Sequence, residues 1–250
     1  MESWIEFGRG SLFRFAFVLM ILGLGRLVVL TVAGLWEVWR DMPDRRLPWA
    51  DIRRNTAGWL FPVGRLWRRR PVYSTVSFAF HVGLLVVPLT LAAHLLLWKR
   101  TVGAAWPAIP QPLANWLTVL AIATGAALFV MRAAHAPTRA LSRAQDMLWP
   151  LLLIVPFSTG FLCSNAVLSP PAYRTLMLLH IYAGDLILLL IPFTKIAHCV
   201  LAPFSQLVGA MSWKLAPGAG DRVAATLGYA EQPTWIAGSR VAGSGARKEA

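Results

Sequence analysis

The 250-residue sequence has few charged side chains, and most of those it has carry the same sign. Charged residues make up 14% of the chain and hydrophobic residues 57%, whereas about a quarter of a soluble domain is charged. Acidic residues are the scarcest, with 11 Asp and Glu against 24 Lys and Arg. The mean hydropathy is +0.57. This composition argues against a soluble domain and favours a membrane protein.

Cysteine is also scarce. The chain holds only Cys163 and Cys199, with no CxxC pair and no CxxCH sequence, which argues against an iron–sulfur cluster or a covalently attached heme held by this chain. The two cysteines fall at the ends of successive apolar segments, so they are predicted near opposite membrane faces. A disulfide needs Cα atoms within about 7 Å, and we therefore expect two free thiols.

Long apolar segments are what the sequence has in abundance. Each is long enough for a membrane crossing, which takes about 20 residues. The first is too long for the apolar core of a signal peptide, and no A-x-A cleavage site follows it, so we expect a retained anchor. We predict an all-α integral membrane protein, a bundle of five transmembrane helices within residues 1–205, with spans at about 11–36, 73–98, 113–133, 148–168 and 174–202.

The net charge of +13 is concentrated in three stretches: 37–72, 134–147 and the tail 206–250. The connections on the other side hold only Arg9, Lys99, Arg100 and Arg174. The positive-inside rule then places the N-terminus outside and the C-terminus in the cytoplasm. Basic residues placed between apolar runs indicate anionic lipid as their partner, not nucleic acid. The tail is predicted to be a docking arm for a partner or a disordered end.

Four of the five histidines lie on two of the apolar segments. His81 and His94 belong to the second segment, and His180 and His198 to the fifth. If the fifth is one helix, eighteen residues make five turns, so His180 and His198 share a face about 27 Å apart. Antiparallel packing of the two segments would pair His81 with His198 near the inner face and His94 with His180 near the outer face.

Two histidines that face each other across a helix bundle suit an iron porphyrin with two axial protein ligands. Two such sites at two depths would carry electrons across the membrane. Two alternatives stay open for these side chains. A single intramembrane histidine can serve as a hydrogen-bonding group between helices. Zinc also binds imidazole, but a zinc site would need three or four ligands at one depth.

Two sequence motifs resemble a known family. The stretch FHVG at 80–83 and the stretch HIYAGDLILLLIPFTKIAH at 180–198 are similar to the cytochrome b (gamma) subunit of respiratory nitrate reductase. They are also similar to related membrane subunits of complexes linked to sulfite and heterodisulfide reduction. The eighteen-residue histidine spacing, the PF[ST][KR] step and the five-span layout carry the resemblance, which covers residues 11–202.

The resemblance implies a subunit with two b-type hemes in a bacterial or archaeal cytoplasmic membrane. His81 and His198 would bind the inner heme iron, and His94 and His180 the outer one. Electrons would pass from membrane quinol, oxidised near the outer heme, to an iron–sulfur partner subunit on the cytoplasmic side. Nitrate reductase subunits space the two histidines of the second span ten residues apart, but here Leu91 stands at that position. Pro88 could kink the helix and so re-aim His94.

Three charged residues inside or beside the spans need partners. Arg26 lies within the first span, where burying it costs about 3 kcal/mol. It is predicted to contact the inner heme propionate or an acid, or else to extend its side chain to the interface. Arg174 would serve an outer propionate or anchor the helix at the interface. Asp185 is the acid deepest within a span, so it is a candidate to accept a quinol proton or to form a structural hydrogen bond.

The sequence therefore predicts a diheme membrane cytochrome, the electron-transfer subunit of a quinol-linked oxidoreductase complex. A heme-free membrane anchor for a soluble redox enzyme is the alternative. A histidine-lined transporter is a third interpretation, which would call for acidic residues at the membrane midplane, and Asp185 alone gives it little support.

Overall fold

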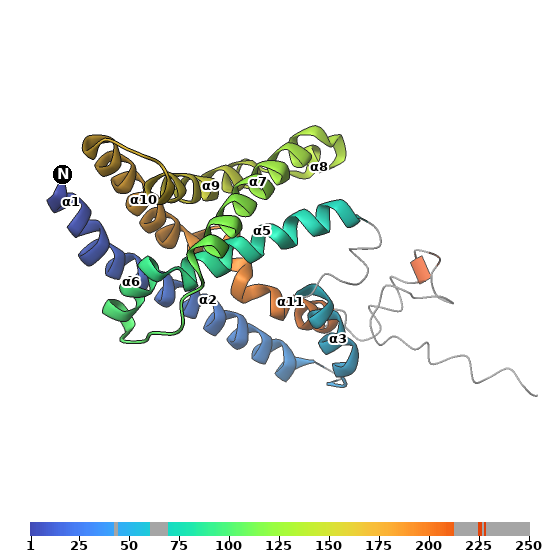
Figure 1. Cartoon of the computed structure of the whole chain (residues 1–250). Coiled ribbons are helices and arrows are strands. Elements are labelled where there is room, and N and C mark those ends of the chain that lie inside the picture. Colours follow the sequence, from blue (N-terminus) through green and yellow to red (C-terminus); the bar gives the residue numbers. More distant parts are fainter. Residues whose placement is uncertain (43–44, 61–69, 213–224, 227, 229–250) are drawn as a thin grey trace, which may run out of the picture. The chain divides into compact units, whose positions relative to one another are not determined.

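The computed structural model describes residues 1–42, 45–60, 70–212, 225–226 and 228, and helices are the regular secondary structure within them. Five of its helices are long and apolar enough to cross a membrane (Figure 1). The prediction of an all-α chain with five membrane-length apolar helices is confirmed. The observed spans are Glu2–Asp41, Pro71–Thr90, Gln111–Ala134, Ala144–Asn165 and Pro170–Phe193.

The chain divides into two compact units. Unit 1 comprises Met1–Gly23 and Gly64–Ile196, and unit 2 comprises Leu24–Val63 and Ala197–Ala250. In unit 2, α3 (Trp49–Leu60) packs against α11 (His198–Ser212). The helix α2 (Phe13–Asp41) contributes its first part to unit 1 and the rest to unit 2. The other elements belong to unit 1: α1 (Glu2–Phe7), η1 (Gly8–Leu12), α5 (Pro71–Thr90), α6 (Ala92–Val102), α7 (Gln111–Ala134), α8 (Ala136–Leu141), α9 (Ala144–Asn165) and α10 (Pro170–Leu190).

The long helices of unit 1 pack in chain order, α5 on α7, α7 on α9 and α9 on α10, and α10 also contacts α1 and η1 (Figure 1). Each long helix contributes one residue to a shared buried cluster of Phe80, Leu128, Leu153 and Ile187. Gly83 of the FHVG motif lets α5 and α7 approach closely, because a Cβ there would lie 2.7 Å from the carbonyl oxygen of Leu117.

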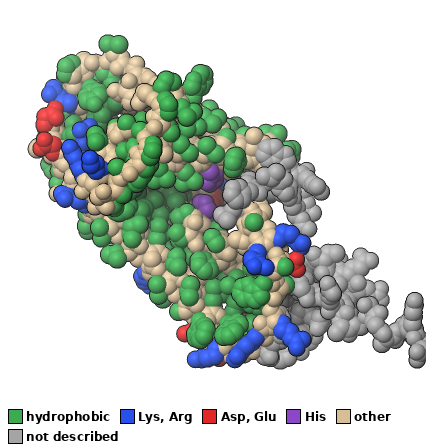
Figure 2. Space-filling view, turned by 60° about the horizontal axis from the view of Figure 1, so that its bottom comes forward, with side chains coloured by type: hydrophobic (Ala, Val, Ile, Leu, Met, Phe, Trp, Pro, Cys, Tyr) green, Lys and Arg blue, Asp and Glu red, His purple; other side chains and the backbone are tan. Residues whose placement is uncertain are grey.

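Large apolar side chains cover the outside of these helices, as expected of a protein whose surroundings are lipid. Hydrophobic side chains occupy much of the face seen in Figure 2. On α7, Trp116 is 74% exposed and Val130 is 58% exposed. Polar threonines on the same helix, such as Thr118 and Thr124, are buried and donate to the helix's own carbonyls. The helix is therefore apolar where it faces outward and partly polar where it faces the bundle.

The second apolar segment is two helices and not one. The prediction of a single span over 73–98 is wrong, because α5 ends at Thr90, Leu91 is extended at φ −66° and ψ 131°, and α6 begins at Ala92. Pro88 contributes to the break, since proline has no N–H to donate and its ring crowds the preceding turn. A helix that ends inside a membrane leaves carbonyl groups that need new donors.

Those carbonyl groups find donors in the segment that follows. The indole N–H of Trp98 donates to the Pro88 carbonyl at 3.1 Å, and that of Trp106 donates to the Leu89 carbonyl at 2.8 Å. The backbone N–H of Ile109 donates to the Thr90 carbonyl at 3.1 Å. The carbonyl groups of Pro88, Leu89 and Thr90 at the break are therefore hydrogen-bonded, two of them by tryptophan side chains.

The fifth apolar segment is also interrupted. The prediction of one continuous helix from His180 to His198 is wrong: α10 ends at Leu190, a 3₁₀ turn covers Ile191–Phe193, and α11 begins at His198. Pro192 explains the end of α10, because a proline inside a helix removes one backbone hydrogen bond. The shared face and the 27 Å separation predicted for the two histidines, which required one straight helix, therefore do not hold.

The structure also tests the predictions for the two cysteines and for the end of the helical domain. Cys163 and Cys199 are both free thiols, as predicted. α11 continues to Ser212, past the predicted boundary between 205 and 206. Most of the tail predicted to dock a partner lies outside the described residues.

Candidate functional site

His94 and His180 form the pair that the structure brings together within unit 1. Their imidazole rings are nearly parallel, at 7° between planes, with ring centroids 5.9 Å apart. His94 lies in the first turn of α6, just after the break at Leu91, and His180 lies in the middle of α10. His94, which stands thirteen residues after His81, thus approaches His180 just after the break in the second apolar segment.

His180 is held from α9. Its Nδ1–H donates to the backbone carbonyl of Pro156 at 2.8 Å, which is a normal hydrogen-bond length. The hydroxyl oxygen of Thr159 lies 3.5 Å from the same nitrogen. Donation from Nδ1 leaves the lone pair of the neutral ring on Nε2.

His94 is held more loosely, by its own segment. Its Nδ1–H approaches the Val87 carbonyl at 3.4 Å, which is long for a hydrogen bond. Its backbone N–H donates to the Leu91 carbonyl at 2.9 Å and so starts the first turn of α6. The ring again presents Nε2 as its basic nitrogen.

His81 and His198 belong to different units. The Nδ1–H of His81 donates to the Ser77 carbonyl one turn back on α5, at 2.7 Å, and its ring meets the edge of Phe80. His198 is the first residue of α11 in unit 2. Their predicted pairing as inner ligands stays a prediction.

The distance between the His94 and His180 ring centroids is the one expected of two imidazoles bound to one metal ion. Metal–imidazole bonds are about 2 Å long, so two rings bound through Nε2 to one ion place their centroids roughly 6 Å apart. Donation of the second ring nitrogen to a backbone carbonyl is the usual support of a metal-binding histidine. In the part of the chain that the structure describes, no group of three or more His, Cys, Asp or Glu side chains lies together. Within unit 1, His94 and His180 are therefore the two residues that would hold a two-ligand group such as a b-type heme.

His135, the fifth histidine, has a structural place. It is exposed between α7 and α8, where its Nδ1 accepts the backbone N–H of Thr138 at 3.3 Å and caps α8. A histidine that caps a helix in this way offers a natural control for substitutions at His94 and His180.

The three charged residues singled out from the sequence have different surroundings. Arg26 is exposed on α2, and within the described part of unit 2 no acidic side chain forms an ion pair with it. Arg174 lies 3.7 Å from the Glu2 carboxylate. Asp185 is only 3% exposed, and among the described residues its Oδ2 has no hydrogen-bond donor. A buried carboxyl oxygen without a donor is costly and is a candidate for function.

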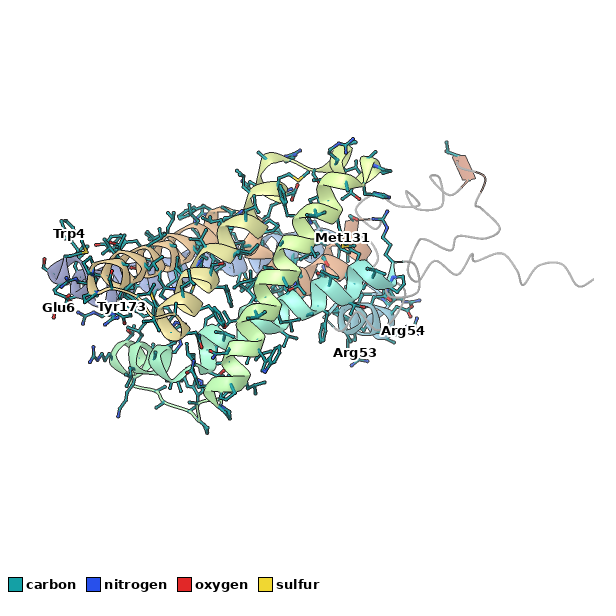
Figure 3. The ribbon with its side chains drawn as sticks, turned by 45° about the horizontal axis from the view of Figure 1, so that its top comes forward. Trp4, Glu6, Arg53, Arg54, Met131 and Tyr173 are labelled. Carbon is teal, nitrogen blue, oxygen red and sulfur yellow. The ribbon has the colours of Figure 1, made fainter. Side chains whose placement is uncertain are left out.

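A pocket of about 420 Å³ opens beside the start of α10. Its polar lining includes Glu2, Arg9, Tyr173 and Arg174, and Met177 lies at its apolar side. In Figure 3, Trp4 and Glu6 of the N-terminal helix lie at the same end as Tyr173. Sequence reasoning missed Glu2, Arg9 and Tyr173, because no local pattern shows that the first ten residues return to α10.

Comparison with known proteins relates the chain to a protein of stated organism but of no stated function. A protein of Nitratidesulfovibrio vulgaris strain Hildenborough is 37% identical over 167 residues, which cover 66% of this chain and 72% of that protein. The two chains belong to one family. The relative's name is simply "Protein", and so it states no function. No model of a known protein family matches the chain, and no solved structure matches it.

Proposed function

We propose that the protein is a diheme b-type cytochrome, the membrane subunit that carries electrons between the quinone pool and an iron–sulfur partner of a respiratory complex. The observation that supports this most is the parallel His94–His180 pair, with centroids 5.9 Å apart and each Nδ1 directed to a carbonyl. Bound heme would supply reversible one-electron chemistry at iron. The chain's own part would be to hold the heme through the His94 and His180 rings, which the Val87 and Pro156 carbonyls orient.

The pocket beside α10 is the space that we propose for the quinol headgroup. Met177, which lines it, stands three residues before His180, so the pocket lies about one helical turn from the outer pair. Oxidation of one quinol to quinone releases two electrons and two protons. The Glu2 carboxylate can accept a proton, and the Tyr173 hydroxyl can hydrogen-bond a quinol oxygen. With the orientation predicted by loop charge, the protons would leave on the outer side.

The cytoplasmic end would pass the electrons on. His81 and His198 are the proposed ligands of the inner heme, and Arg26 the proposed contact of its propionate. Arg174 already lies 3.7 Å from the Glu2 carboxylate. A propionate of the outer heme would therefore compete with Glu2 for this guanidinium group. The partner would be an iron–sulfur subunit at the cytoplasmic face, where the basic connections and the tail 206–250 are proposed to contact it and anionic lipid.

Asp185 is the proposed internal proton site. Its buried carboxyl lies five residues after His180 on α10, or about 7.5 Å along the helix. Reduction of a nearby centre adds negative charge, and proton uptake by the carboxyl would offset that charge in surroundings of low dielectric constant. The side chain would thus couple electron arrival to proton binding.

A spectrum of the purified full-length protein tests the main proposal. The dithionite-reduced protein should show a b-type α band, with about two hemes per chain. His94→Ala and His180→Ala should each remove one of them, whereas His135→Ala should remove none. A purified wild-type protein without heme would overturn the proposal and support the heme-free anchor instead.

Glu2→Gln tests the quinol pocket. The variant should be reduced more slowly by a quinol analogue at unchanged heme content, and an unchanged rate of reduction would overturn the quinol pocket alone.

A further inference from the structure

We infer that α9 carries a seat for the His180 imidazole, made of the Pro156 carbonyl and the bare Cα of Gly160. The seat fixes which nitrogen His180 offers to a bound group and in which direction. The inference rests on the proposed function, because it assigns a positioning role to residues of α9 around the outer centre.

The closeness of the ring to Gly160 is the first observation. A Cβ at Gly160 would lie 2.8 Å from Cε1 and 3.0 Å from Nδ1 of His180. Carbon atoms that are not bonded to each other make favourable contacts at about 3.5–4.0 Å, so any side chain at position 160 would have to displace the ring. Only glycine lets the imidazole rest directly on the helix backbone here.

The hydrogen bond to Pro156 is the second observation. Pro156 precedes Gly160 by four residues, so the two lie on the same face of α9, one turn apart. The Pro156 carbonyl accepts the Nδ1–H of His180 at 2.8 Å while Gly160 leaves room for the ring beside it. A methyl group at 160 would push the ring away from this carbonyl. The contact and the hydrogen bond therefore depend on each other.

The consequence for a bound iron is a change in ligand strength. A histidine that donates its second N–H to a carbonyl is a stronger electron donor, which favours the oxidised metal. His94 has only a 3.4 Å contact of this kind. The seat therefore makes His180 the firmer and more basic of the two ligands and lowers the reduction potential of their shared centre.

Gly160→Ala in the full-length protein tests the seat, with Gly34→Ala as the matched control. Gly34 lies on α2, and a Cβ there would have no neighbouring atom within 4 Å, so the same added methyl enters another apolar helix without a contact. His180→Ala first identifies the heme component that depends on His180. We expect Gly160→Ala to remove that component or to raise its midpoint potential, and to leave the other heme and the Gly34→Ala protein unchanged.

Three results would overturn the seat: no change in Gly160→Ala, an equal change in both hemes, or the same change in Gly34→Ala. If Gly160→Ala does not accumulate, imidazole and 1-methylimidazole are added to the His180→Ala protein instead, because only imidazole has an N–H to donate to the Pro156 carbonyl. Imidazole should restore the missing component at a lower midpoint potential than 1-methylimidazole does, and no difference between the two would overturn the seat. A wild-type protein without heme would instead defeat the proposed function, so the two failures are distinguishable.

Discussion

At the scale of single residues, the buried carboxyl group of Asp185 is the most unusual side chain of unit 1. It is 3% exposed in the middle of α10, and its Oδ2 lacks a donor among the described residues. A structural carboxyl would be expected to have both oxygens hydrogen-bonded. The side chain is therefore suited to hold a proton, which supplies a donor of its own.

Asp185→Asn tests this proton role. The amide has nearly the same shape but does not titrate, so the protein should fold and bind heme as the wild type does. Reduction favours protonation of the carboxyl, so the wild-type midpoint potential should fall as pH rises. The variant should show a flatter dependence in a redox titration at several pH values. An equal slope in both proteins would contradict the role of Asp185.

The sequence was sufficient to single out the four histidines of the apolar segments, but it predicted their positions in space only in part. The proposal that His94 faces His180 needed a kink at Pro88, and the structure has a break three residues later. The stabilising donors of that break, Trp98 and Trp106, carry no motif. Gly160 could not be singled out either, because a glycine in an apolar helix has many uses and only the position of the His180 ring distinguishes this one.

At the scale of elements, the junction between α5 and α6 depends on tryptophan N–H groups. Trp98 donates to the Pro88 carbonyl at 3.1 Å and packs edge-on against Phe13 and Phe17, with ring centroids 5.9 and 5.3 Å away. Hydrogen bond and packing hold α6 at one angle, and that angle directs His94 toward His180.

Trp98→Phe separates these two contributions. Phenylalanine keeps an aromatic ring but has no N–H, so the Pro88 carbonyl loses its donor, at a cost of about 1–3 kcal/mol. We expect a thermal midpoint in detergent lowered by several degrees and a perturbed His94-dependent heme signal. Trp116→Phe is the control, because Trp116 is 74% exposed on α7. Equal midpoints for the two variants would show that the indole hydrogen bond does not stabilise the junction.

The end of α10 shows why hydropathy alone could not place the last elements. The run from 180 to 202 is mostly apolar, yet the helix stops at Leu190. Polar contacts hold the chain after the stop: the Thr194 hydroxyl donates to the Leu190 carbonyl at 2.9 Å, and the Lys195 ammonium lies 2.6 Å from Asp146 of α9. Asp146 is far from Lys195 in the sequence, and a hydropathy average does not report a hydrogen bond such as that of Thr194.

At the scale of the whole molecule, composition and segment length were sufficient to predict the helical class and the five membrane-length helices. They were not sufficient to predict the division into two units, since α2 contributes to both. That division depends on contacts between residues far apart in the chain. The predicted orientation rests on loop charge, and it calls for an experiment of its own.

Two engineered cysteines test the orientation. Both native cysteines are first replaced by serine, and a single cysteine is then introduced as Val167→Cys or as Leu141→Cys. Val167 lies in the connection between α9 and α10 and is 105% exposed, and Leu141 is the last residue of α8 and is 86% exposed. A membrane-impermeant maleimide added to intact cells should label position 167 and leave position 141 unlabelled, while both should react in opened membranes. The reverse labelling pattern would invert the proposed direction of proton release.

The extended residue Leu91 has a consequence for finding related chains. Where a helix is interrupted, the number of residues between two ligands no longer measures the angle or the height between them. His81 and His94 stand thirteen residues apart, an interval that a search built on uninterrupted helical turns would reject. Patterns that tolerate a short insertion after an intramembrane proline should recover chains of this kind that fixed-interval patterns overlook.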